Sequence, residues 1–316
     1  MRLRYPVAFM RLRFPFLLVL FTLLLASLCS CQPAASPANG FTFVVTADMR
    51  NFAVEPLYFA GACDAIAKSG KGDFMISLGD IDPPDDVLST IRARIPGDYP
   101  WVPVVGNHEI DTAYGSPHPF TYGIDWVRAY TLPFAVNQGP AGAEKTCFSF
   151  DYGNAHFAVI NEYYDGTSDN VLVNGHGYIS ASLLTWVSAD LAATAKPVIF
   201  VVGHEPAFPQ PDAESGRVRH LGESLDANAV QRDAFWNALS LHSVRAYICG
   251  HTHDYSLYRK DGVWQVDAGH ARGTGDTGAR STFVKLTVRG DATVSYETWR
   301  LNLSTGNYEI TGAGSL

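Results

Sequence analysis

The sequence predicts an α/β fold, and three observations lead to this prediction. Short apolar runs that resemble buried strands alternate with segments of helical periodicity through most of the chain. Five of these runs end in Asp, Asn or His. From Trp264 onward, strand-like segments follow one another without helices. Ligands of open α/β sheets collect outside the carboxyl ends of the strands, so the polar residues that end these runs are expected to converge.

The first elements of the predicted domain, which spans residues 41–301, alternate between strand and helix. Phe41–Thr46 is an apolar strand, and Asp48 follows it. Residues 56–68 are expected to form a helix that begins with a proline and ends before Gly70. Phe74–Leu78 is the second strand, and Gly79-Asp80 closes it.

The next segment is expected to contain a loop, a helix and a strand that reaches Gly106-Asn107-His108-Glu109. Residues 82–86 hold two prolines and three acids, which predicts a loop, and 87–95 a short helix. The Val104-Val105 run indicates a buried strand followed by a turn. Residues 111–147 are rich in Gly, Pro, Tyr and Phe, with one helical stretch at 125–130, and form either a substrate-facing insertion or a packed cover.

The second half is expected to begin with a hairpin and to continue with helix–strand pairs. Gly153-Asn154 is the expected hairpin turn. Helices are predicted at 180–194 and 227–241, and strands at 148–152, 156–161, 198–202, 247–249, 265–267, 282–288 and 293–301. Residues 302–316 are expected to be a C-terminal tail.

The amino terminus has the features of an export signal. Four arginines precede the apolar run Phe14–Leu28, which has the length of a signal-peptide core. Leu28-Cys29-Ser30-Cys31 resembles a bacterial lipobox. We therefore expect residues 1–30 to be a lipoprotein signal peptide, a lipidated Cys31 that anchors the protein to a membrane of the cell envelope, and a flexible tether at 31–40. The alternative is simple cleavage and a secreted, soluble protein.

Composition and charge limit the possible partners. With 47% hydrophobic and 17% charged residues, the chain is an ordinary globular protein. Removal of residues 1–30 deletes four arginines and no acid, which changes the net charge from −8 to −12. Such an acidic body argues against nucleic acid as the main partner. Among Cys63, Cys147 and Cys249, one pair could form a disulfide, but the sequence does not say which.

The polar residues at the strand ends form a candidate metal site. Carboxylate, amide oxygen and imidazole suit Mn, Fe or Zn better than Ca or Cu(I). The candidate ligands are Asp48, Asp80, Asn107, His204, His251 and His253. Most other histidines are expected on the surface or packed, and only His270, just after a strand, is expected near the site.

With these motifs the chain resembles the calcineurin-like metallophosphoesterase superfamily and its purple-acid-phosphatase-like branch. The matching motifs occur in the family's order: Gly79-Asp80, Gly106-Asn107-His108-Glu109, Gly203-His204 and Gly250-His251-Thr252-His253. The resemblance implies a four-layer αββα sandwich, in which helices flank two mixed β-sheets, and two divalent or trivalent transition metal ions at one edge. It also implies metal-dependent hydrolysis of a phosphorylated substrate by an activated water.

The resemblance also implies a role for each candidate residue. Asp80 would bridge both metal ions, and Asp48 and His253 would hold the first. The second would be held by Asn107, His204 and His251. His108 would not be a ligand but would donate a proton to the leaving-group oxygen.

Arg50 departs from the family pattern, in which Asp-x-His is common at the first motif. A guanidinium has no lone pair for a metal ion, so the first site lacks one ligand. We expect Arg50 either to grip a phosphoryl oxygen or to turn away and pair with Asp82 or Asp85. The departure leaves an alternative function open, a phosphate- or nucleotide-binding lipoprotein with one metal ion and little turnover.

Overall fold

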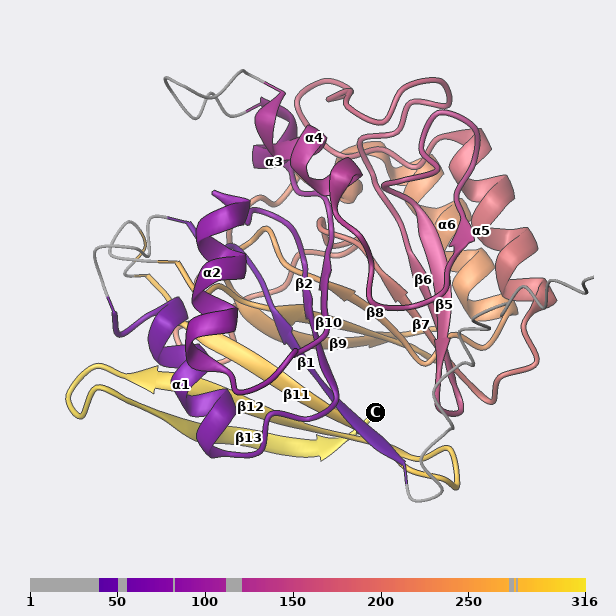
Figure 1. Ribbon diagram of the computed structural model, residues 1–316. Helices are drawn as coiled ribbons and strands as arrows, with labels where there is room; N and C mark the ends of the chain where they lie inside the picture. The colour runs from indigo at the N-terminus through magenta and orange to yellow at the C-terminus, as the bar shows by residue number, and fades with distance from the viewer. Residues whose placement is uncertain (1–39, 51–55, 82, 112–120, 273–275, 277) are drawn as a thin grey trace, which may run out of the picture. The chain divides into compact units, whose positions relative to one another are not determined.

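The computed structural model describes residues 40–316 except 51–55, 82, 112–120, 273–275 and 277 (Figure 1). The expected signal peptide, Cys31 and nearly all of the expected tether lie outside the described residues, as does Asp82. Within the described part of the chain, no helix is both long and apolar enough to span a bilayer.

The strands form two mixed sheets (Figure 1). In the first sheet β1, β2 and β3 are parallel, and β11, β12 and β13 extend it antiparallel from β1. Its order is β13 (Asn307–Ser315), β12 (Val294–Asn302), β11 (Thr282–Val288), β1 (Phe41–Thr46), β2 (Phe74–Ser77) and β3 (Trp101–Pro103).

The second sheet has a parallel centre and antiparallel edges. Strands β6, β7, β8 and β10 run parallel, whereas β4 and β5 on one side and β9 on the other are antiparallel to their neighbours. Its order is β4 (Asn137–Gln138), β5 (Phe148–Tyr152), β6 (Ala155–Val159), β7 (Val198–Val202), β8 (Ala246–Cys249), β10 (Val263–Ala268) and β9 (Tyr255–Lys260).

Alternating side chains join the sheets to each other and to the helices. Phe43 and Val45 of β1 point into the core between the sheets, where the ring of Phe43 lies 5.1 Å from that of Phe157. Val44, between them, belongs instead to the core beneath α1 (Phe59–Lys68) and α2 (Pro84–Arg94). On the outer face of the second sheet, α5 (Ala181–Ala193) and α6 (Ala229–Leu241) pack in the same way. The predicted αββα sandwich is therefore confirmed.

The remaining helices are short. α3 (Asn107–Asp111) follows β3, and the 3-10 helix η1 (Leu225–Asn228) precedes α6. In α4 (Tyr122–Ala129), Trp126 lies 5.7 Å from the ring of Trp101 on β3. This described part of the 111–147 segment is thus a packed cover of the first sheet.

The expectation of a C-terminal tail at 302–316 is wrong. Asn302 and Asn307 close a hairpin whose turn contains Gly306 at φ +70°, and β13 then pairs with β12. Tyr308 of β13 is buried, and its hydroxyl lies 2.7 Å from Ser281 Oγ. The sequence contains the turn signal and the β-forming residues after it, but only one face of this edge strand is covered, so its apolar pattern is weak.

Several other boundaries differ from the prediction by a few residues, and two of them have a clear cause. β3 ends at Pro103 and Val104-Val105 follows it, because the chain must turn to begin α3 at Asn107. α2 starts at Pro84, inside the predicted loop, since proline is accepted in the first helical turn. β4 and β9 were not predicted. Cys63, Cys147 and Cys249 are all buried and free, so no disulfide joins them.

Candidate metal centre

The candidate ligands lie where the parallel strands of both sheets end. Asp48 and Asp80 follow β1 and β2, and Asn107 opens α3 after β3. His204 follows β7, while His251 and His253 follow β8. The convergence predicted from the strand ends is therefore observed, and it joins residues from the two sheets.

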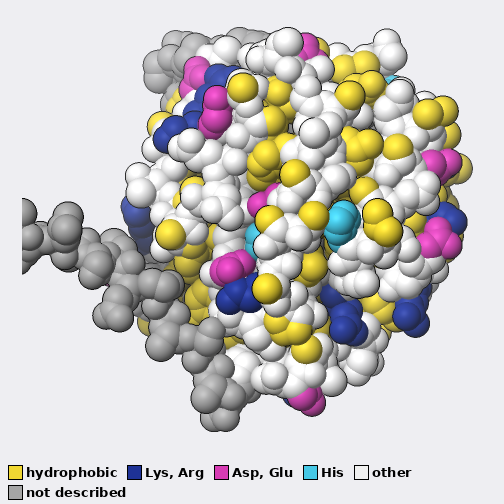
Figure 2. Space-filling view, turned by 90° about the vertical axis from the view of Figure 1, so that its right-hand side faces the viewer, with side chains coloured by type: hydrophobic (Ala, Val, Ile, Leu, Met, Phe, Trp, Pro, Cys, Tyr) yellow, Lys and Arg dark blue, Asp and Glu magenta, His cyan; other side chains and the backbone are white. Residues whose placement is uncertain are grey.

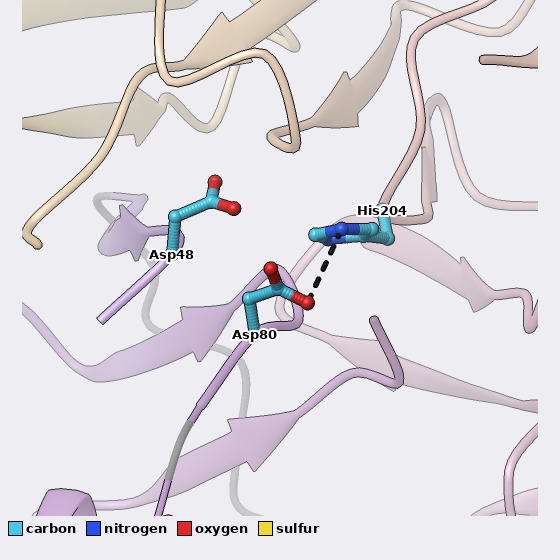
Figure 3. A group of neighbouring side chains, drawn as sticks. All are labelled: Asp48, Asp80 and His204. Atoms are coloured by element: carbon cyan, nitrogen blue, oxygen red, sulfur yellow. Dashed lines mark ion pairs between the residues drawn. The ribbon is translucent and has the colours of Figure 1, made fainter. Parts of the chain in front are cut away.

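Asp48, Asp80 and His204 form the centre of the group (Figure 3). All three are buried, and one ligand atom from each lies within 4.8 Å of the others. The ion pair drawn in Figure 3 joins Asp80 Oδ1 and His204 Nε2 at 3.5 Å. This arrangement is expected for a transition metal ion that is bound by carboxylate and imidazole ligands.

Lone pairs converge around His204 Nε2. His204 Nδ1 donates to the carbonyl oxygen of Leu78 at 2.6 Å, which leaves Nε2 without a proton in the neutral ring. Nε2 lies 3.2 Å from Asn107 Oδ1 and 3.2 Å from His251 Nδ1. Metal–ligand bonds of about 2.0–2.2 Å place neighbouring ligand atoms about 3–3.5 Å apart, so these atoms fit a shared cation.

A carboxylate and an imidazole, those of Asp48 and His253, face each other on another side of the group. His253 Nε2 is 3.4 Å from Asp48 Oδ1, which is buried and has no hydrogen-bond partner among the described residues. Buried polar atoms are nearly always hydrogen-bonded. The other oxygen, Asp48 Oδ2, accepts from the backbone N–H of His251 at 2.9 Å, which fixes the carboxylate. An unpartnered oxygen facing an imidazole nitrogen is again suited to a cation.

The electrostatics agree with sites built for cations. Burial disfavours the charged form of His204, but the carboxylates of Asp80 and Asp48 outweigh burial and raise its pKa to about 9. Burial also raises the pKa of Asp80, but the charges of His204, His108 and Arg50 outweigh burial and hold it well below its usual range. The centre therefore attracts positive charge, which a metal ion would supply.

The backbone at these strand ends is unusual. Asp48, Asp80, His251 and His253 all have positive φ, at 53°, 53°, 70° and 60°. For a residue other than glycine this conformation costs about 1–2 kcal/mol and persists only where the surroundings enforce it. It turns each side chain out of its strand direction and into the shared centre.

The glycines of the motifs allow the two sheets to approach each other here. A Cβ on Gly79, whose φ is +91°, would lie 2.5 Å from His204 Nδ1. A Cβ on Gly106 would lie 2.4 Å from the backbone nitrogen of Asp80. Any larger residue would therefore push the ligand loops apart.

Glu109 joins two of these loops. Its Oε2 accepts from the N–H groups of Gly106 at 2.6 Å and Asp80 at 2.9 Å, and its Oε1 accepts from Ile81 at 2.9 Å. The Glu of the Gly-Asn-His-Glu motif is thus a clamp that holds the Asp80 loop against the start of α3.

His108 and Arg50 form a pair beside Asp80. Arg50 Nη1 lies 2.5 Å from His108 Nε2, and this nitrogen lies 3.7 Å from Asp80 Oδ2. Both side chains are partly exposed, unlike the buried carboxylates beneath them. Arg50 is therefore part of the centre, on the side where His108 opens to solvent.

Other side chains were not predicted to belong to the site. Asp276 Oδ2 lies 2.5 Å from His253 Nδ1 and 2.8 Å from Arg219 Nη1, so it orients the imidazole. His220, expected to be a surface or packed residue, has its ring 4.4 Å from that of His251. The sequence feature that could have indicated these residues is the basic stretch Arg217-Val218-Arg219-His220, in the segment that follows the carboxyl end of β7.

His270 lies close to the centre, as predicted. Its ring is 5.4 Å from that of His253, and it is fully buried. Nε2 donates to the carbonyl of Ala279 at 3.2 Å, and Nδ1 accepts from the N–H of Arg272 at 3.1 Å. Both ring nitrogens of His270 are thus engaged in hydrogen bonds to the backbone.

The comparison with known families agrees with this geometry. The model of the calcineurin-like phosphoesterase family matches residues 41–255. The chain belongs to this family. Its members use divalent metal ions to hydrolyse phosphate esters. The curated proteins compared gave no match.

Solved structures share the fold at low sequence identity. A purple acid phosphatase from yellow lupin (Lupinus luteus) seeds is 16% identical with a TM-score of 0.60, over 90% of this chain and 54% of that one. A structure of PhoD is 15% identical with a TM-score of 0.60, over 90% and 73%. GAP50 of Plasmodium, described as the anchor in the inner membrane complex, is 13% identical with a TM-score of 0.52, over 88% and 89%. The chain thus spans about half the length of the lupin phosphatase.

Proposed function

We propose that this chain hydrolyses phosphate esters at a centre that holds two transition metal ions, Mn, Fe or Zn. The observation that supports it most is the division of the lone pairs into two groups on either side of Asp80. One group surrounds His204 Nε2, and the other faces Asp48 Oδ1. In this proposal Asp80 belongs to both groups. The other ligands are Asp48 and His253 for the first ion, and Asn107, His204 and His251 for the second.

The metal ions would supply Lewis-acid activation of a water nucleophile and neutralise charge on the phosphoryl oxygens. The protein's own groups then handle the rest of the substrate. Arg50 donates hydrogen bonds to a phosphoryl oxygen, for which the planar guanidinium is well suited. His108 lies beside Arg50 at the exposed edge, and its Nε2 accepts from the guanidinium. Once Arg50 turns to the phosphoryl oxygen, this nitrogen is released to carry a proton and give it to the leaving-group oxygen. A phosphorylated substrate therefore enters on the Arg50–His108 side.

The proposal is tested by removing and restoring metal ions. Treatment with a chelator should abolish hydrolysis of p-nitrophenyl phosphate and of bis(p-nitrophenyl) phosphate, and Mn, Fe or Zn should restore it. The ratio of the two activities separates a monoesterase from a diesterase. Full activity in protein shown by elemental analysis to be free of metal would overturn the proposal.

One observation favours the alternative of a phosphate-binding protein with a single metal ion. Arg50 occupies the position of the family's histidine, and its guanidinium contacts His108 rather than providing a ligand. Metal content and turnover decide between the two. Two ions per chain with multiple turnovers support the hydrolase, and one ion with tight phosphate binding but no turnover supports the binding protein. Arg50→His should then raise the metal content toward two in phosphate-free buffer.

We also propose that the chain is exported and carries a lipid on Cys31. Support comes from the sequence alone, through the apolar run Phe14–Leu28 and the lipobox-like residues that end at Cys31.

A further inference from the structure

Arg272 lies beside the centre and takes no part in the proposed hydrolysis described above. It comes after β10, and its backbone is fixed on both sides. The N–H of Ala271 donates to the carbonyl of Ala47 at 2.8 Å, and the N–H of Arg272 donates to His270 Nδ1 at 3.1 Å. The residue is thereby held next to the Asp48 segment.

The strand order places the backbone of Arg272 on the β11 side of Asp48. In the first sheet β1 lies between β2 and β11. Asp80 and His108 belong to the β2 and β3 side. The Arg272 segment is instead joined to the start of β11, where the N–H of Thr282 donates to the carbonyl of His270 at 2.7 Å. Asp48, at the end of β1, is therefore between the two.

The guanidinium of Arg272 has no hydrogen-bond or ion-pair partner among the residues that the structure describes, and its Nε is buried. Burial, followed by the positive charge of Arg50, lowers its pKa, and the more weakly acting charges of Asp276 and Asp48 do not outweigh them. By contrast, the neighbouring Arg217 donates to Asp254 at 2.7 Å and also pairs with Asp276. A partly buried guanidinium that forms no ion pair is less stable than a paired one, so an anionic ligand at this position would be stabilising.

The nearby carboxylates are already in use. Asp276 accepts from Arg217 and Arg219 and holds His253. Asp48 Oδ2 accepts from the N–H of His251, and its Oδ1 faces His253. Neither forms a hydrogen bond or an ion pair with Arg272 in the described part of the chain. A bound anion would supply the ion pair that the described residues do not provide.

We propose that Arg272, with Arg50 and Arg219 nearby, binds a second phosphate group of the substrate, next to the phosphoryl group that is hydrolysed. This inference rests on the proposed function and names its substrate class: compounds with a terminal diphosphate, such as nucleoside diphosphates. Arg50 and His108 serve the scissile terminal phosphoryl group, and Arg272, beyond Asp48, pairs with the adjacent phosphate. Hydrolysis adds one water, breaks the P–O bond between the phosphates, and yields inorganic phosphate and the monophosphate.

The test compares ADP with AMP, which differ by one phosphate. With Mn in excess, the wild-type protein should show a higher kcat/KM for ADP. Arg272→Gln should lower the ADP value on the order of tenfold or more and leave AMP hydrolysis nearly unchanged, because one charge-assisted interaction is lost. Arg272→Lys should retain part of the preference. Arg94→Gln, which removes an exposed arginine paired with Asp64 at 3.0 Å, is the matched control.

Binding provides a readout that does not depend on turnover. Calorimetry with the non-hydrolysable α,β-methylene analogue of ADP should give a Kd on the order of tenfold weaker for Arg272→Gln than for the wild-type protein. If the folded variant loses ADP and AMP hydrolysis equally, Arg272 serves the scissile group and the inference is wrong. It is also wrong if neither changes. If the metal-loaded wild type hydrolyses no ester at all but binds the analogue through Arg272, the proposed function fails while the diphosphate site stands.

Discussion

His108 has a proposed role that requires no metal ligation, which makes it the most informative single residue. His108→Ala should retain the metal ions but lower turnover on the order of a hundredfold or more, the usual contribution of a general acid. Esters with good leaving groups should be affected less, because their departure needs no proton. Elemental analysis and kcat on two leaving groups provide the measurement.

The control for this substitution is His242→Ala. His242 follows α6 before β8 begins, and so lies at the opposite ends of the parallel strands from the centre. It should leave both metal content and turnover unchanged. Loss of metal from His108→Ala would show instead that His108 is a ligand, and the proposed roles would have to be reassigned.

Individual residues show which parts of the site the sequence could reveal. The ligand types stand directly after apolar runs, so Asp80 and His204 could be predicted from local pattern and from family motifs. Asp276 and Arg272 could not, because they follow β10 in a segment without a recognisable motif and reach the centre only through the packing of the sheets. The contact of Arg50 with His108 joins residues 58 positions apart, a distance over which local pattern carries no information.

Among the helices and strands, the predicted boundaries were most accurate where the apolar pattern is strongest. β1, β7 and β11 are buried and were predicted with the bounds observed. Most residues of β13 are exposed, and its register depends on the hairpin with β12. The sequence pattern therefore did not distinguish this strand from a tail. Central strands were therefore predictable, whereas edge strands depended on tertiary pairing.

His156 on β6 connects three elements and should make stability depend on pH. Its Nδ1 lies 2.8 Å from Asp151 Oδ1 on β5, and its Nε2 lies 2.8 Å from Asp190 Oδ2 on α5. Burial lowers the pKa of this imidazole, but the hydrogen bonds and charges of Asp190 and Asp151 outweigh burial and raise it above its ordinary value. The charged, bridging form is thus favoured in the folded protein.

The sign of the effect follows from that raised pKa. The stabilisation is fully present below the unfolded pKa of about 6.5 and is lost as pH rises through the higher folded pKa. His156→Gln should therefore cost on the order of 1–3 kcal/mol at pH 6 and clearly less at pH 9. Urea unfolding of both proteins at the two pH values measures this, and an equal cost at both would exclude the charged bridge.

At the scale of the whole molecule, charge does not favour a nucleic-acid partner. The view turned by 90° shows acidic and basic side chains next to each other in mixed groups rather than in a field of one sign (Figure 2). Without residues 1–30, the chain has a net charge of −12. Arg50, Arg219 and Arg272 lie around the centre, and bound metal ions would add positive charge there. A small anion that reaches this centre is attracted over a short range, whereas a long polyanion would be repelled by the rest of the surface.

Membrane attachment is the remaining prediction at this scale. The apolar run Phe14–Leu28 would extend about 22 Å as a helix, which is less than the hydrocarbon thickness of about 30 Å, so a lipid rather than this run should hold the protein to a membrane. Expressed in a bacterial host, the mature protein should begin at an acylated Cys31 and remain with the membrane fraction, as mass spectrometry of its amino terminus would show. Cys31→Ser should leave the signal uncleaved or release the protein, while hydrolysis by the folded domain continues. An unmodified amino terminus well downstream of Cys31 in the wild-type protein would instead show simple secretion.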